Sequence, residues 1–123
     1  MPTFICLLNW TDQGAKTAKD AGKRYQASKV LAEKLGGKLL SSYIATGQYD
    51  VIATLDMPDG QAMAKFAVAL SASGNARTST VRAYPPEEFA KLAAETPSMS
   101  VSHPNTTRFQ RPSRLIGTGS VIS

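Results

Sequence analysis

The stretch T-F-I-C-L-L-N-W at residues 3–10 constrains the fold more than any other feature of this sequence. It is a short apolar run between polar residues, which predicts a β-strand. Side chains alternate along a strand, so Ile5 points to one face while Phe4 and Leu8 point to the other. Both faces are largely apolar, and we therefore expect this strand to be covered on both sides.

A helix is predicted over about residues 20–35, after a turn at 11–14. Gly36 and Gly37 should end this helix, because glycine readily takes the left-handed conformation found at helix C-termini. The apolar stripe that we expect to face the sheet consists of Ala27, Val30, Leu31 and Leu35.

The remaining elements follow from the same patterns. Strands are predicted over 38–45, 51–56 and 76–84. Asp59 is expected to cap a second helix that runs to about residue 73, with the apolar stripe Ala62, Met63, Phe66, Ala69 and Leu70. Two prolines followed by two glutamates at 85–88 begin a short third helix that runs to about residue 94.

The predicted order β-α-β-β-α-β, followed by one terminal helix, indicates an α+β fold of the ferredoxin-like type. Two right-handed crossovers place both helices on one face of a four-stranded antiparallel sheet. The opposite face would then expose apolar side chains to water. A second copy of the chain packing sheet to sheet would cover it, so we expect a homo-oligomer that is at least a dimer.

Charge and cysteine content exclude several classes of protein. Residues 1–95 hold 11 Lys or Arg and 9 Asp or Glu, a net charge of +2, while 96–123 add three arginines and no acid. The basic character thus belongs largely to the tail, and we expect no nucleic-acid partner. A lone cysteine forms no internal disulfide, and no apolar run is long enough for a membrane helix, so a cytoplasmic location is expected.

Three stretches resemble the GYD domain family of small bacterial proteins: L-L-N-W-T-D-Q-G at 7–14, G-Q-Y-D at 47–50 and G-N-A-R-T-S-T-V-R-A at 74–83. The resemblance spans about residues 1–95, which we expect to form one GYD domain, followed by a tail at 96–123. It implies a dimeric α+β barrel, in agreement with the assembly expected above. It implies no particular reaction.

Five residues are candidates for binding a ligand: Asn9, Trp10, Tyr49, Asp50 and Arg82. Tyr49 and Asp50 could anchor a ligand or act as acid and base, but a structural role in the hairpin is favoured. In that role Gly47 supplies a positive φ, while Asp50 accepts turn N–H groups or pairs with an arginine. Trp10 could equally form a ligand wall or close the end of the barrel.

Other reactive residues indicate structure rather than chemistry. Cys6 is expected to be buried, and the single histidine, His103, lies in the tail, so neither a metal site nor a cofactor is expected. Lys16, Lys19 and Lys23 should share one helical face with Arg24 beside it. Such a cluster near a helix N-terminus could hold an anion, but a solvated surface is favoured.

The tail is rich in Pro, Ser and Thr and ends in R-L-I-G-T-G-S-V-I-S. Its apolar residues could dock on a neighbouring subunit or on another protein, in which case 108–123 form the docking segment. The ending loosely resembles the terminal peptides that load encapsulin shells. A frayed terminus is the alternative. The candidate docking residues are Leu115, Ile116, Val121 and Ile122.

These observations favour a homo-oligomeric module without catalysis that binds a small molecule or serves assembly. One alternative is a cofactor-free oxygenase or isomerase that uses Tyr49 and Asp50 near Trp10. Another is an interaction protein that its C-terminal peptide recruits to a larger assembly or shell.

Overall fold

The computed structural model of the chain describes residues 1–99. They form an α+β structure whose first 89 residues, Met1–Phe89, make one compact unit. The elements are β1 (Thr3–Trp10), α1 (Asp12–Lys16), the 3-10 helix η1 (Ala18–Asp20), α2 (Ala21–Lys34), β2 (Lys38–Ile44), β3 (Val51–Asp56), α3 (Gly60–Ala72), β4 (Ala76–Ala83) and α4 (Pro86–Glu95).

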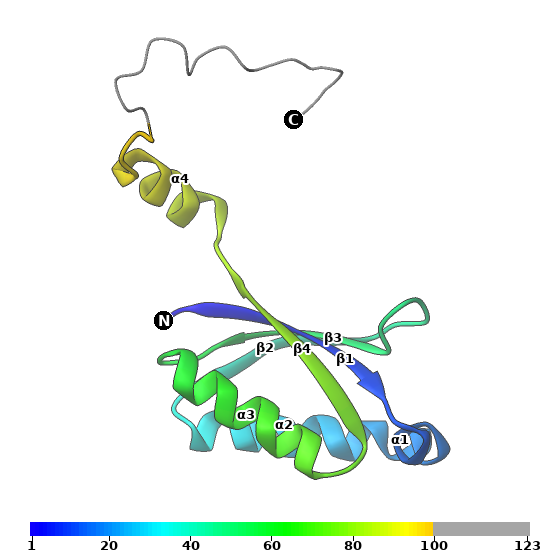
Figure 1. Ribbon diagram of the computed structural model, residues 1–123. Helices are drawn as coiled ribbons and strands as arrows, with labels where there is room; N and C mark the ends of the chain where they lie inside the picture. The colour runs from blue at the N-terminus through cyan, green and yellow to red at the C-terminus, as the bar shows by residue number, and fades with distance from the viewer. Residues whose placement is uncertain (100–123) are drawn as a thin grey trace, which may run out of the picture. The chain divides into compact units, whose positions relative to one another are not determined.

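The four strands form one antiparallel sheet in the order β2-β3-β1-β4, which confirms the predicted sheet. The central strand β1 pairs with both β3 and β4, and Cys6 lies opposite Ala53 on one side and Thr80 on the other. Helices α2 and α3 pack against the same face of the sheet, as Figure 1 shows. This arrangement is consistent with the expected ferredoxin-like topology.

The core lies between that face and the two helices. It is built from alternate residues of β1 and β3 together with the inner sides of α2 and α3. The strand stretch 3–10 follows the predicted alternation, since Phe4 and Cys6 are buried in this layer. The buried hydrophobic residues are Phe4, Cys6, Ala32, Ala53, Leu55, Met57, Ala62, Met63, Phe66 and Ala76.

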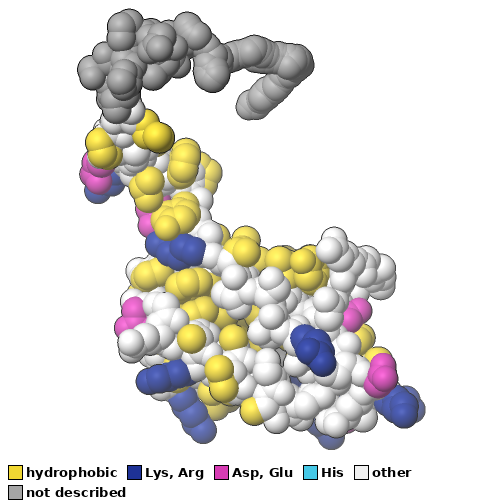
Figure 2. Space-filling model, viewed as in Figure 1, with side chains coloured by type: hydrophobic (Ala, Val, Ile, Leu, Met, Phe, Trp, Pro, Cys, Tyr) yellow, Lys and Arg dark blue, Asp and Glu magenta, His cyan; other side chains and the backbone are white. Residues whose placement is uncertain are grey.

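The other side of the sheet carries a group of apolar side chains that remain at the surface of this unit. Helices α1, α2 and α3 all lie on the core side, so none of them covers it (Figure 1). Figure 2 shows hydrophobic side chains reaching the surface along the sheet on the side away from these helices. We call this surface the open face; Thr54 and Ser79 are among its polar residues, and its apolar residues are Ile5, Leu7, Tyr43, Ile52 and Val81. Of these, Tyr43 is 68% exposed, Val81 44% and Ile52 37%.

The predicted apolar stripe of α2 is correct in part, because Leu31 and Leu35 pack against the core while its other two residues do not. Val30 is 50% exposed, and Ala27 is also exposed, whereas Ala32 is completely buried. The half-buried Ser28 also lies on the core side, where it lines a cavity described below. The prediction went wrong because small residues, which add little to a hydrophobic stripe, fill the place closest to the sheet. In α3, likewise, Ala69 is exposed although the other predicted stripe residues pack in or against the core.

The expected turn at residues 11–14 is instead the start of helix α1. Thr11 caps this helix, because its side-chain oxygen accepts a hydrogen bond from the Gly14 N–H at 3.1 Å. The Thr17 hydroxyl bonds back to the Gln13 carbonyl at 2.9 Å, and the chain continues as η1 before α2 begins.

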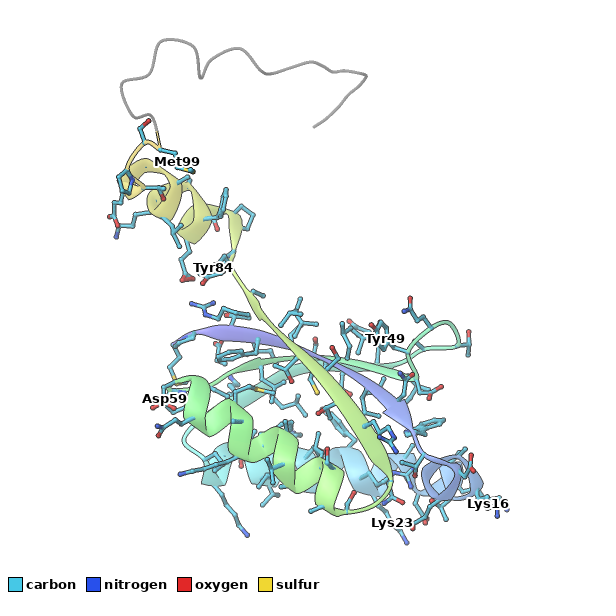
Figure 3. All side chains as sticks on the ribbon, in the orientation of Figure 1. Lys16, Lys23, Tyr49, Asp59, Tyr84 and Met99 are labelled. Atoms are coloured by element: carbon cyan, nitrogen blue, oxygen red, sulfur yellow. The ribbon has the colours of Figure 1, made fainter. Side chains whose placement is uncertain are left out.

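The three lysines expected on one helical face therefore lie on three elements: Lys16 on α1, Lys19 on η1 and Lys23 on α2. All three are exposed. Figure 3 shows Lys16 and Lys23 projecting away from the protein. The expected single cationic stripe is not present, because the helix is interrupted between them.

Two helix-end predictions are confirmed. Gly36 adopts a left-handed conformation, with φ of 85°, where α2 ends. Asp59 caps α3, its carboxylate accepting the Ala62 N–H at 2.8 Å.

The prediction for Gly47 was wrong, because the positive-φ glycines among residues 1–99 are Gly36 and Gly74. The β2–β3 connection spans six residues and closes through the Ala45 N–H and the Asp50 carbonyl at 2.8 Å. A connection of this length does not need the φ > 0 residue of a two-residue turn.

A second unit begins at Ala90, within α4, and the structure describes it as far as residue 99. Helix α4 starts with Pro86, and its first turn carries Glu87 and Glu88, as predicted. The tail candidates Leu115, Ile116, Val121 and Ile122 lie outside the described residues. Within residues 1–99, the helices are too short or too polar to cross a bilayer.

Candidate functional site

The C-terminal end of β1 brings together the three stretches on which the family resemblance rests. The Thr11 N–H donates to the Asn75 carbonyl at 3.0 Å, and the Thr11 hydroxyl donates to the Gly74 carbonyl at 2.6 Å. The Gln13 side-chain amide adds a bond to the Asn75 side chain at 2.9 Å. We call this contact between residues 11–14 and 74–75 the β1–β4 junction.

Asp50 joins the Gly-Gln-Tyr-Asp stretch to the same place. Its backbone N–H donates to the Leu8 carbonyl at 2.9 Å, and its carboxylate accepts the Trp10 N–H, also at 2.9 Å. A carboxylate bond to a backbone N–H is charge-assisted and strong. Asp50 therefore fixes the β2–β3 hairpin against the last residues of β1.

A cavity of about 90 Å³ lies beside this junction, between the sheet and helices α2 and α3. It is open at the surface and mostly apolar. Its lining comes from all four strands and both helices: Cys6, Leu8, Trp10, Ala21, Arg24, Tyr25, Ser28, Leu39, Ser42, Ile44, Val51, Ala53, Phe66, Leu70, Ser73, Asn75 and Ala76. This volume exceeds several-fold the roughly 10–15 Å³ that one water requires on the same kind of measure.

Arg24 contributes the only charge to that lining. Its guanidinium lies 5.8 Å from the centre of the Trp10 ring, within cation–π range. Nη1 donates to the Thr17 carbonyl at 3.1 Å and to the Thr17 hydroxyl at 2.8 Å, while Nη2 donates to the Gly14 carbonyl at 3.1 Å. These contacts fix the orientation of the guanidinium, and within residues 1–99 no carboxylate pairs with it.

The structure does not gather the five predicted ligand-binding residues into one place. Trp10 lines the cavity, whereas Asn9 points to the opposite face of the sheet. Tyr49 lies half-buried in the β2–β3 connection (Figure 3), and its hydroxyl has no hydrogen-bond partner among residues 1–99. Arg82 lies opposite Phe4, six residues from Trp10 along β1, which corresponds to about 20 Å.

Arg82 is occupied by contacts of its own. Its guanidinium stacks over the Tyr84 ring at 4.2 Å and lies 5.7 Å from the Phe4 ring. Nη1 donates to the Thr3 carbonyl at 3.2 Å, and Nη2 pairs with Glu88 at 3.2 Å. The acidic partner of Arg82 is thus Glu88, whereas Asp50 takes the first of its two predicted roles and accepts a backbone N–H.

Cys6 is buried, with 2% of its surface exposed. Burial raises the pKa of its thiol, and a hydrogen bond with Thr80 opposes this shift only in part. A neutral, buried thiol is a poor nucleophile. Within residues 1–99 no three His, Cys, Asp or Glu side chains are grouped as a metal site would require.

Sequence reasoning placed Arg24 beside a lysine cluster that could hold an anion, and it favoured a solvated surface over that role. In the structure the helix is interrupted at Thr17, and Arg24, in the first turns of α2, lines the cavity. The spacing of Arg24 and Ser28, four residues apart on one helix and both next to the cavity, is the signal that could have placed them together.

Comparison with known proteins supports the resemblance of the three stretches to the GYD domain family. The model of the GYD domain matches residues 4–93. The glutamine synthetase and cystathionine beta-lyase binding protein of Thermus thermophilus is 30% identical over 86 residues, covering 69% of this chain and 90% of that protein. The crystal structure of TTHA0845, also from Thermus thermophilus, aligns at 25% identity with a TM-score of 0.45, covering 69% of this chain and 95% of that one. The chain belongs to the GYD domain family.

Proposed function

We propose that this protein is a non-catalytic, protein-binding module that acts as a homodimer in the cytoplasm. The observation that carries the proposal is the open face, a sheet surface whose group of apolar side chains is left uncovered by α1, α2 and α3. Water contact with such a surface is unfavourable, and a stable protein interface removes it. The finer architecture that we propose is a dimeric α+β barrel formed by two ferredoxin-like units, with 1–95 as the GYD domain and 96–123 as a separate tail.

The dimensions of the sheet support a second copy as the occupant of the open face. Four strands of six to eight residues give a flat projected area of about 450 Å². The side chains that protrude from the sheet add to this accessible surface. A standard interface buries about 800 Å² of accessible surface on each partner. A corrugated sheet face of this size comes close to that value, and a face-to-face dimer covers both open faces at once.

The name of the Thermus relative supports a role in binding other proteins. We propose that the dimer binds a metabolic enzyme, with glutamine synthetase and cystathionine β-lyase of the same organism as the first candidates. The contacts of Asp50 favour binding over cofactor-free catalysis, because its carboxylate accepts the Trp10 backbone N–H and so has a structural role. We further propose the C-terminal segment 108–123 as a second contact with the partner, through Leu115, Ile116, Val121 and Ile122.

The dimer is tested by placing one charge on the open face. Val81→Lys is compared with Val68→Lys, a change at a 67% exposed valine on α3. We expect the wild type and Val68→Lys to sediment at about twice the 13.1 kDa of one chain, and Val81→Lys to sediment as a folded monomer. A wild type that stays monomeric at high micromolar concentration would refute the homodimer.

The enzyme partner is tested by biolayer interferometry on immobilised glutamine synthetase and cystathionine β-lyase from the same organism. Full-length protein should bind at least one of them saturably, and a chain ending at residue 99 should bind more weakly if 108–123 adds contacts. Equal binding by both lengths would remove the tail from the proposal. If the full-length dimer binds neither enzyme, the proposal that these two enzymes are its partners is wrong.

A further inference from the structure

We propose that the cavity between the sheet and helices α2 and α3 is a binding site for a small carboxylate with a short aliphatic body. It lies on the opposite side of the sheet from the open face, so it is separate from the protein-binding surface proposed above. Neither the family match nor the named relative assigns a ligand to this part of the protein.

The apolar side chains that line the cavity indicate that part of the ligand is apolar. Leu8, Val51, Phe66 and Leu70 contribute aliphatic or aromatic surface to the cavity. An apolar cavity of about 150 Å³ can bind benzene, so about 90 Å³ suits a chain of a few carbon atoms that continues toward the open end. Enclosing such a chain removes its apolar surface from water, which favours binding.

The positive charge of Arg24 indicates that the ligand carries a negative charge. The guanidinium has five N–H groups, and its contacts with Thr17 and Gly14 account for three of them. The Nε–H and one Nη2–H remain without a hydrogen-bond partner among residues 1–99. Two adjacent N–H groups on a planar guanidinium match the two oxygens of a carboxylate.

The bonds to Thr17 and Gly14 have a second consequence. They hold the guanidinium in place before any ligand arrives, and the Trp10 ring packs against it. A fixed side chain loses little conformational entropy when it binds, which favours the complex. Polar groups from Tyr25, Ser28, Ser42, Ser73 and Asn75 line the same cavity and can accept or donate further hydrogen bonds.

The test uses a panel of probes of similar size: hexanoate, hexanamide, hexylamine and inorganic phosphate. Binding to the full-length protein is followed by two-dimensional NMR, with the Arg24 Nε–H and the Trp10 indole N–H as local reporters. We expect hexanoate to saturate in the millimolar range or below and to shift both reporters. Hexanamide should bind at least tenfold more weakly, and hexylamine and phosphate should leave both reporters unchanged.

Four variants locate the site. Arg24→Gln should weaken hexanoate about tenfold or more, and Arg24→Lys should retain part of the affinity because the charge is kept. Ser42→Leu, which fills the cavity, should abolish binding, while Ser71→Leu on the exposed side of α3 should not change it. The proposal is overturned if hexanoate does not saturate, if hexanamide or phosphate binds equally well, or if Arg24→Gln binds hexanoate like the wild type.

Discussion

Replacing Gly14 by alanine tests whether the β1–β4 junction holds the fold together. Gly14 lies in α1 and is buried, and it does not adopt a left-handed conformation, so alanine suits its backbone. The obstacle is space, because an added Cβ would lie closer than 3.0 Å to the Asn75 carbonyl oxygen and 3.2 Å from the Trp10 Cβ. Backbone atoms of this kind cannot move aside as the end of a flexible side chain can.

The cost follows from the contacts that must shift. Moving Asn75 away disturbs the bond from the Thr11 N–H, and with it the bond from the Thr11 hydroxyl to Gly74, each contributing about 1 kcal/mol. Overpacking a tight site adds about 1–3 kcal/mol, while alanine regains up to about 1 kcal/mol of helix propensity. We expect the free energy of unfolding to fall by about 2–4 kcal/mol, or Tm by roughly 10–25 °C for a domain of this size.

Urea unfolding followed by circular dichroism measures this change, and Gly22→Ala is the matched control. Gly22 also lies in a helix, but an added Cβ meets nothing within 4 Å, so alanine there should stabilise the protein by about 0.4–1 kcal/mol. The two substitutions are chemically identical and differ in their surroundings. If Gly14→Ala proves as stable as Gly22→Ala, the close approach of α1 to Asn75 is not a feature of the protein in solution.

Three further outcomes are expected. Asp50→Ala should lower the free energy of unfolding by about 1–3 kcal/mol in urea titrations, because the Trp10 N–H loses its acceptor. Tyr49→Phe should change the free energy of unfolding by less than about 0.5 kcal/mol. Equal effects of the two substitutions would contradict the positioning role of Asp50. Asp59→Ala should cost about 1 kcal/mol through the lost cap of α3, and an unchanged unfolding midpoint would contradict it. For Cys6, the folded pKa is raised, so the unfolded chain releases the thiol proton first, and stability should fall as the pH rises above the ordinary value of 9.0. Cys6→Ala should reduce this alkaline slope, measured by urea unfolding between about pH 8 and 10.5, and an unchanged slope would show that the thiol does not cause it.

The architecture was predictable because each element carries its own local signal. The bounds of β1 and β3 agree with the prediction, and the Asp59 cap and the Gly36 helix end were correctly identified from residue type. These features depend on neighbours along the chain, which the sequence displays directly.

The position of α2 and the contents of the cavity were harder to predict, because they depend on tertiary contacts. Val30 is a strong hydrophobic residue that remains half exposed, while the small residues Ser28 and Ala32 lie toward the sheet. The orientation of Arg24 depends on a helix interruption at Thr17, where a hydroxyl bonds back to a carbonyl. Such interruptions leave no hydrophobic signature, so the lysines and Arg24 were assigned to one continuous helix.

The structure also changes what substitutions in the Gly-Gln-Tyr-Asp stretch can reveal. Asp50 holds the N–H of Trp10, and the Trp10 ring stacks on Arg24 at the cavity. Loss of ligand binding in Asp50→Asn would therefore be expected even if Asp50 never touches a ligand, because the change reaches Arg24 through Trp10. Strand alternation offers a cleaner separation: Leu7 lies on the open face while Leu8 lines the cavity. A substitution at Leu7 that removes the dimer but keeps carboxylate binding, paired with one at Leu8 that does the reverse, separates the two proposed sites within one strand.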